Sequence, residues 1–178
     1  MIFRTATAKD AEAIAHLHAE SWRRTYRGAY SDTFLDHDVV ADRVAVWTER
    51  FRSSDPNAHT VIAEDDGALI GFVHTILDED PTWGALLDNL HVAHDRKRSG
   101  IGAQLMAQSA AVVLERRPGS GLYLWVLEMN GVAQSFYDAC GGECVESAPW
   151  DAPGGGTVMS LRYAWTDPAV LRQTITPG

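Results

Sequence analysis

The spacing of apolar residues separates a helical first part of the chain from a strand-rich remainder. Between residues 11 and 26 the apolar side chains Ile14, Leu17, Trp22 and Tyr26 recur at about helical spacing, which predicts an amphipathic helix. A second helical pattern begins near residues 31–32, breaks at 37–38 and resumes over 39–51. The first third of the chain is therefore expected to be mostly helical.

From residue 59 the pattern changes to short runs of apolar and β-branched residues. The segment Asp65-Asp66-Gly67 is a hairpin signal between strands predicted at 59–64 and 69–77. Further strands are predicted at 2–4, 86–92, 122–127, 143–146 and 157–165, and further helices after Gly102 and over 132–140. The acidic segment 78–81 is predicted to be a loop, and the Pro- and Gly-rich segment 147–156 a long flexible one.

This order of elements predicts a mixed α/β (α+β) fold in one domain over residues 1–178. The predicted order is one strand, two helices, three antiparallel strands, a helix, a strand, a helix and two strands. Such an order suits three layers, in which helices flank a mostly antiparallel central sheet. The length of 178 residues and the hydrophobic content of 46% suit one domain with a sizeable core.

Charge and cysteine content narrow the classes of partner. The formal net charge is −9, so nucleic acid is not expected as a partner. No apolar run approaches the length of a membrane span and no signal peptide is evident, so a cytoplasmic protein with no membrane partner is expected. Cys140 and Cys144 lack a second Cys or His pair that would complete a zinc site, and two reduced thiols are expected.

The segment 88–103 carries the strongest chemical signal. An apolar strand runs into the cations Arg96, Lys97 and Arg98 and then into Gly100-x-Gly102 at the start of a helix. Free backbone N–H groups and the positive end of a helix bind anions such as phosphate. Leu105 stands where a dinucleotide-binding motif needs a third small residue, and the Gly-Lys-Ser/Thr of a Walker-type loop is absent, so neither common nucleotide site is expected.

This segment resembles the phosphate-binding motif of the GNAT family, the acetyl-CoA-dependent N-acyltransferases. Lys97-x-x-Gly100-x-Gly102 follows Leu90-His91-Val92 as the family's Gln/Arg-x-x-Gly-x-Gly/Ala follows its strand, although Lys97 replaces Gln or Arg, and His94 and Arg98 replace the usual Pro and Gly. The resemblance implies that the coenzyme A pyrophosphate is wrapped by Lys97, Arg98, Ser99, Gly100, Ile101, Gly102 and Ala103. It also implies that the backbone of Leu90 and Val92 pairs with the pantetheine arm.

A second segment, Asn130-x-x-Ala133-x-x-Phe136-Tyr137 followed by Gly141-Gly142, is similar to a later motif of the same family. There the Asn contacts the cofactor and the Tyr lies by the thioester, which implies these roles for Asn130 and Tyr137. Residues 4–11 and 21–28 are also similar to GNAT chains. The resemblance therefore implies a GNAT-like fold and an N-acetyltransferase that uses acetyl-CoA as co-substrate.

Acyl transfer needs a proton donor for the departing thiolate, an oxyanion donor and a proton acceptor for the amine. Tyr137 is the candidate acid and the Val92 amide the candidate oxyanion donor, although Tyr137 also fits an ordinary core stripe. Asp88, His91 and Glu128 are the candidate bases, with a carboxylate acting through water as plausible as the histidine. A metal pair of His91 and His94 has no third ligand, so no metal is expected.

The acceptor is expected to be a primary amine on a small molecule, a peptide N-terminus or a lysine. Candidate walls of its pocket, which packing into the core explains equally well, are Trp22, Tyr26, Tyr30, Trp83 and Trp150. The alternative function is a non-catalytic acyl-CoA-binding module that regulates a partner. The oligomeric state is left open, with a homodimer as one option.

Overall fold

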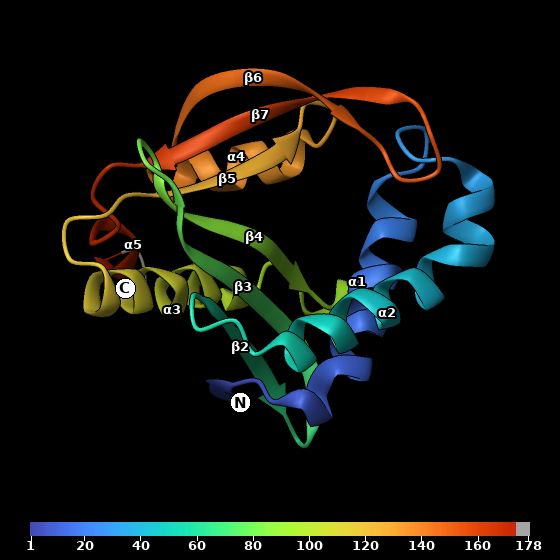
Figure 1. Ribbon diagram of the computed structural model, residues 1–178, viewed down its shortest axis with the longest axis horizontal. Coiled ribbons are helices and arrows are strands. Elements are labelled where there is room, and N and C mark those ends of the chain that lie inside the picture. The colour runs from blue at the N-terminus through green and yellow to red at the C-terminus, as the bar shows by residue number, and fades with distance from the viewer. Residues whose placement is uncertain (174–178) are drawn as a thin grey trace.

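A seven-stranded sheet in the order β1-β2-β3-β4-β5-β7-β6 forms the middle of the computed structural model, which describes residues 1–173 (Figure 1). Neighbouring strands are antiparallel except β4 and β5, which run parallel. The strands are β1 (Ile2–Thr5), β2 (Ala58–Asp65), β3 (Ala68–Asp80), β4 (Gly84–Val92), β5 (Leu122–Leu127), β6 (Glu143–Asp151) and β7 (Thr157–Trp165). The helices are α1 (Ala11–Thr25), α2 (Val39–Ser53), α3 (Ile101–Arg116), α4 (Gly131–Ala139) and α5 (Val170–Gln173), with short helical turns η1 (Ala8–Asp10), η2 (Phe34–Asp38) and η3 (His94–Arg96).

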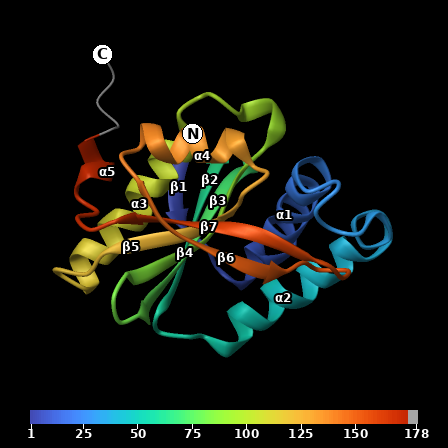
Figure 2. The ribbon, with the colours of Figure 1, turned by 90° about the horizontal axis from the view of Figure 1, so that it is seen from above.

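Helices cover both faces of this sheet (Figure 2). α1 and α2 pack on one face, where Ile14 and Trp47 are buried together with Phe72 of β3. α3 and α4 pack on the opposite face, where Leu105 and Tyr137 belong to the largest hydrophobic cluster. The predicted three-layer fold with a mostly antiparallel central sheet is confirmed. No helix within residues 1–173 is both long enough and apolar enough to cross a bilayer.

Most predicted elements have the boundaries that the hydrophobic pattern indicates. The helix predicted over 11–26 is α1, and the strands predicted over 122–127 and 157–165 are β5 and β7. The predicted hairpin turn joins β2 to β3, with Asp66 and Gly67 both at positive φ. The expected break at residues 37–38 is instead the π-helical turn η2, which leads directly into α2.

The prediction of a long loop over 147–156 is wrong. Ser147–Asp151 extend β6 and pair with β7 from Leu161 back to Thr157, so that only the segment after Asp151 forms the turn. Pro149 is tolerated because β6 is an edge strand, where one side of the backbone needs no partner. The prediction of a loop over 78–81 is also wrong for most of its length, because β3 continues to Asp80.

Candidate active site

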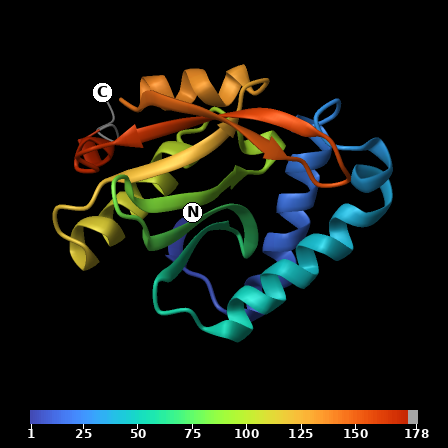
Figure 3. The ribbon, with the colours of Figure 1, turned by 45° about the horizontal axis from the view of Figure 1, so that its top comes forward.

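The two parallel central strands pair only at their beginnings. Ala85 pairs with Leu122 and Leu86 with Tyr123, and within the described residues no further pair joins β4 to β5. β4 nevertheless continues to Val92 and β5 to Leu127, and the two strands diverge (Figure 3). We call the facing unpaired edges, residues 87–92 and 124–127, the fork. The fork offers strand edges to which an extended ligand could bond.

The backbone of β4 points two amides into the fork. The Ala93 amide donates to the Ile70 carbonyl of β3 at 2.8 Å. Because successive N–H groups of a strand point to opposite edges, the amide of Val92, and likewise that of Leu90, points away from β3 and towards β5. These are the two residues whose backbone is expected to meet the pantetheine arm.

A β-bulge in β4 decides which side chains face which layer. His74 of β3 pairs with Asn89 and Thr75 pairs with Leu87, so Asp88 has no opposite residue in β3. Leu87 therefore packs in the α3 cluster, whereas Asp88 and Asn89 both contact Arg50 of α2. Strand parity alone would have placed Asp88 and Asn89 on opposite faces.

The loop between β4 and α3 carries two cations that have no partner within the described residues. Lys97 and Arg98 are exposed and form no ion pair there. The neighbouring Arg96 instead binds Asp65 at 3.1 Å, which anchors the loop to the β2–β3 turn, and the Ser99 hydroxyl donates to the Arg96 carbonyl at 2.5 Å. Lys97 and Arg98 are therefore available to a bound anion.

The start of α3 completes the features expected of a phosphate site. Gly100, with φ of +81°, caps the helix, and its first turn contains no acidic residue. The first amides of a helix have no intrahelical acceptor and are free to bind an anion. A Cβ at Gly102 would lie 3.4 Å from the Phe136 ring, an ordinary van der Waals contact, so α4 packs directly against the first turn of α3.

Asn130 lies at the N-terminus of α4 beside the open end of the fork. Its Oδ1 accepts a hydrogen bond from the Ala133 amide at 3.2 Å and so caps α4. Burial raises the pKa of the Tyr26 phenol at the end of α1, and the Asn130 side chain offsets part of that rise. Asn130 therefore fixes the start of α4 next to the end of β5.

Tyr137 projects from α4 into the core, where its ring lies 5.7 Å from that of Tyr163 and 6.2 Å from that of Trp165. Its exposed fraction is 9%. Burial raises the pKa of Tyr137, and the nearby Tyr26 phenol raises it further. The hydroxyl therefore keeps its proton at neutral pH. The structure places Tyr137 in the core stripe, with its phenol protonated.

His91 packs towards α1. Its Nδ1 lies 2.8 Å from the Ser21 hydroxyl, and its ring lies 4.5 Å from that of His18. Burial lowers the pKa of His91 to about 3, and the cations of Lys97 and Arg43 add to this. The imidazole is therefore neutral but a weak proton acceptor.

The other two candidate bases differ in their surroundings. Asp88 accepts a hydrogen bond from Arg50 at 2.6 Å and lies where the fork begins to open. Glu128 follows the end of β5 and is exposed, and its carbonyl accepts a bond from Gln134 at 2.6 Å. Of the three candidate bases, Asp88 is the one that lies in the bulge of β4 and is hydrogen-bonded to an arginine, Arg50.

Four of the five candidate pocket aromatics form one cluster. Trp22 lies 5.0 Å from Tyr30, Tyr26 lies 4.9 Å from Tyr30, and Tyr30 lies 5.7 Å from Trp150 between ring centroids. Trp22 and Tyr30 are buried, whereas Trp150 is 39% exposed. This cluster joins the end of α1 to the β6–β7 hairpin. Trp83 belongs to a separate group of residues.

That separate group surrounds Arg162, which sequence reasoning missed. The Arg162 guanidinium stacks on three rings, with its carbon 4.5 Å from the Trp125 centroid, 4.8 Å from that of Tyr123 and 5.6 Å from that of Trp83. It also lies 3.1 Å from Asp80 and 3.0 Å from Glu146. The only sequence signal was an arginine between the apolar Leu161 and Tyr163 of a strand.

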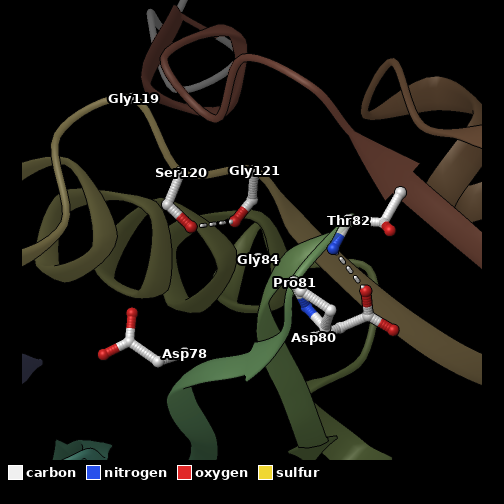
Figure 4. A pocket seen from close by; sticks show the side chains of 8 residues that line it. All are labelled: Asp78, Asp80, Pro81, Thr82, Gly84, Gly119, Ser120 and Gly121. Carbon is white, nitrogen blue, oxygen red and sulfur yellow. Dashed lines mark hydrogen bonds between the residues drawn. The ribbon is translucent and has the colours of Figure 1, made fainter.

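A pocket of about 280 Å³ lies at the opposite, paired end of β4 and β5 (Figure 4). Its carboxylates are already engaged: Asp78 binds Arg117 at 2.6 Å, and Asp80 accepts from the Thr82 amide at 2.7 Å as well as from Arg162. None of the residues expected to bind the cofactor lines this pocket. Within residues 1–173 no three His, Cys, Asp or Glu side chains are grouped so as to hold a metal ion.

Comparisons with known proteins show which family and fold this chain resembles. A model of the Acetyltransferase (GNAT) family matches residues 12–141. The uncharacterized N-acetyltransferase YuaI of Bacillus subtilis (strain 168) is 25% identical over 171 residues, which cover 95% of each protein. The probable N-acetyltransferase Rv2775 of Mycobacterium tuberculosis is 28% identical over 138 residues, 76% of this chain and 75% of that protein. The crystal structure of PaiA N-acetyltransferase from Thermoplasma acidophilum in complex with coenzyme A has a TM-score of 0.69 at 22% identity, over 89% of this chain and 96% of that one, so the two share a fold.

Proposed function

Because the chain belongs to the GNAT family of acetyltransferases and is therefore an acyl-CoA-dependent acetyltransferase, we propose that it transfers acetyl from acetyl-CoA to a primary amine by direct attack on the thioester. The observation that carries the proposal is the fork between β4 and β5, which leads to a loop with two cations that have no partner within residues 1–173. The acceptor is a small-molecule amine, a peptide N-terminus or a lysine.

The residues present fit coenzyme A. Lys97, Arg98 and the free amides at the start of α3 bind the pyrophosphate, in the loop that runs from Lys97 to Ala103. The amide of Leu90 and the carbonyl of Val92 point into the fork and bond the pantetheine arm as an added strand would, which leaves the Val92 amide for the thioester oxygen. The thioester supplies an activated acetyl group, and the structural relative solved with coenzyme A supports this choice of donor.

Tyr137 acts as the proton donor. When the amine nitrogen bonds to the acetyl carbon, the carbonyl oxygen gains negative charge, which the Val92 amide stabilises through a hydrogen bond. When the carbon–sulfur bond breaks, Tyr137 gives its proton to the departing thiolate. Burial raises the pKa of Tyr137, so the phenol is protonated at neutral pH and able to fill this role.

Asp88, acting through water, accepts the proton that the amine loses. The bulge directs its carboxylate to the α1–α2 face of β4, which is the face opposite α4. His91 is the less suitable base because burial holds its pKa near 3. Glu128 lies beyond the end of β5 and is exposed, so it is the less suitable carboxylate. The acceptor amine would then approach between α2 and the Trp22–Tyr26–Tyr30–Trp150 cluster.

The test is release of free thiol from acetyl-CoA across a panel of amines, run beside calorimetric titration with coenzyme A. We expect submillimolar binding of coenzyme A and turnover on a subset of the amines. Binding of coenzyme A without turnover on any small amine, peptide or lysine would favour the alternative of a regulatory acyl-CoA-binding module. No binding of coenzyme A would refute the site itself.

A further inference from the structure

Trp125 is the one residue of the central strand β5 that is not buried. The side chains of β5 alternate between the two faces of the sheet: Leu124 and Val126 belong to the cluster under α3 and α4, whereas Leu127 packs with residues of α1 and α2. Side chains two apart in a strand point the same way, so Trp125 shares the α1–α2 face with Leu127. A large aromatic side chain in the middle of the sheet is therefore partly open on the face from which the acceptor is proposed to arrive.

The register of the sheet places Trp125 across the fork from Asp88. Leu86 and Tyr123 form the last pair that joins β4 to β5. Asp88 and Trp125 each lie two residues beyond that pair, and the Asp88 carboxylate is directed to α2, on the same face as Trp125. The two side chains therefore belong to opposite edges of the fork at the point where it opens.

The β5 positions on either side of Trp125 are covered on this face. Leu127 is buried in a cluster of residues from α1, α2 and the β6–β7 turn. Tyr123 is also buried, and the guanidinium carbon of Arg162 lies 4.8 Å from its ring centroid. At about 3.3 Å per strand residue, Tyr123 and Leu127 are only about 13 Å apart along β5. An amine that reaches Asp88 from this face must therefore pass alongside Trp125.

Arg162 fixes the position of the Trp125 ring. The two residues are paired between β7 and β5, and the guanidinium carbon lies 4.5 Å from the Trp125 ring centroid. The guanidinium is held in turn by Asp80 at 3.1 Å and by Glu146 at 3.0 Å, and the Arg162 side chain is only 12% exposed. The charge of Arg162 is therefore balanced within the protein, and its role at this site is to hold the indole.

We propose that Trp125, positioned by Arg162, contacts the acceptor and selects amines on an apolar arm over amines that carry a carboxylate. This inference rests on the proposed function, because it takes the amine to reach Asp88. The indole offers apolar surface to methylene groups. An acceptor carboxylate gains no free cation here, since Arg50 and Arg162, which contact Asp88 and Trp125, are each paired with a carboxylate already. Desolvating a carboxylate without a partner is costly.

The experiment compares two amines that differ at one end only. Pentylamine and 5-aminopentanoate have the same methylene chain on the amine, but the first ends in a methyl group and the second in a carboxylate. Release of free thiol at saturating acetyl-CoA gives kcat and KM for each amine. We expect the wild type to favour pentylamine at least tenfold in kcat/KM.

Three variants test the two residues. Trp125→Ala removes the ring and should raise the KM of pentylamine at least tenfold with kcat within about threefold, as expected for lost binding, whereas Trp125→Phe keeps an aromatic surface and should stay within about threefold of the wild type in both. Arg162→Lys keeps the charge but loses the flat stacking surface, so it should raise KM by a smaller factor than Trp125→Ala. The Kd of coenzyme A, measured by calorimetry, should stay within about twofold in all three variants.

The outcomes separate this inference from the proposed function. The selectivity is wrong, while the proposed function stands, if the wild type acetylates other amines but not pentylamine, or uses 5-aminopentanoate as well as pentylamine. A wild-type KM in Trp125→Ala, or equal losses of kcat and coenzyme A affinity, would give Trp125 a packing role only. A wild-type KM in Arg162→Lys would remove the positioning role of Arg162. If no amine is acetylated, the proposed function fails and this inference fails with it.

Discussion

Arg50 of α2 donates from Nη2 to Oδ2 of Asp88 at 2.6 Å, and Asp88 is the unpaired residue of the bulge in β4. The second nitrogen, Nη1, donates to the side-chain oxygen of Asn89 at 2.8 Å. Arg50 therefore hydrogen-bonds both residues, Asp88 and Asn89, that the bulge directs towards α2. The pair places a carboxylate at the point where β4 and β5 separate.

Substitutions on the two sides of this pair should have different effects. Asp88→Asn removes the proton acceptor, so kcat/KM for the best amine should fall about 100-fold with little change in coenzyme A affinity. Arg50→Met leaves the carboxylate in place, so turnover should stay within about tenfold while the free energy of unfolding falls by about 1 kcal/mol. Equal losses of turnover would show that the pair only holds the bulge.

Charge reversal in the cofactor loop should weaken coenzyme A binding. Lys97→Glu and Arg98→Glu each replace a cation facing phosphate with a like charge, so each should raise the Kd of coenzyme A at least tenfold, by loss of roughly 1.5–3 kcal/mol. Arg172→Glu makes the same charge change in α5, at the far end of α3 (Figure 1), and should leave the Kd unchanged. Calorimetry provides the comparison, and unchanged affinity in the loop variants would remove the phosphate site.

The backbone of Arg98 makes a separate prediction about stability. Its φ of +63° is in the left-handed region, which disfavours residues with a Cβ by about 1–2 kcal/mol. Arg98→Gly should therefore unfold with a free energy about 1 kcal/mol higher than Arg98→Ala in denaturant, without ligand. Both variants lose the same charge, so only the backbone conformation distinguishes them. Equal stabilities would show that the loop relaxes to accommodate the side chain.

Removal of one hydroxyl tests the candidate acid. Tyr137→Phe should lower kcat about 100-fold and leave the Kd of coenzyme A within about twofold, because the ring continues to fill the core. Tyr163→Phe is the matched control, since that tyrosine packs against Tyr137 at 5.7 Å from the same cluster. Wild-type turnover in Tyr137→Phe would leave this residue with a packing role only.

Buried histidines should make the protein sensitive to acid. Burial lowers the pKa of His91 to about 3 and that of His74 to about 4, below the ordinary value of about 6.5 that each has in the unfolded chain. Below about pH 6.5 the unfolded chain binds a proton at each histidine that the folded protein does not. The free energy of unfolding is therefore highest above about pH 6.5 and decreases as the pH falls towards 4. Each of the two histidines should lower the free energy of unfolding by about 1.4 kcal/mol for every pH unit below about 6.5, down to its own folded pKa.

Denaturant unfolding at pH 7, 6 and 5 measures this slope. His74→Gln should reduce the slope by the contribution of one proton, although it also removes the bond to Thr60 at 2.7 Å and so lowers stability at every pH. The rate profile of the wild type should show no break near pH 6.5 from His91. A stability that does not change between pH 7 and 5 would mean that these imidazoles protonate freely in the folded protein.

Local sequence patterns were sufficient to predict most of the helices and strands. The helical spacing of apolar residues predicts α1, and apolar runs predict β5 and β7, because both patterns lie within consecutive residues. The phosphate-binding role of residues 97–103 stays a prediction, and it could be made from sequence because the cations and glycines are close together in the chain. The edge strand β6 was missed beyond residue 146, since Pro149 and its neighbours resemble a loop until β7 provides a pairing partner.

Contacts between distant segments decide how these parts meet. The bulge at Asp88 is a property of the register between β3 and β4, so the sequence of β4 alone could not assign its faces. The fork depends on where β4 and β5 stop pairing, although the whole of α3 lies between these two strands in the chain. The same reason explains Arg162, which stacks on Tyr123 and Trp125: these residues are distant in sequence, and only the folded chain brings them into contact.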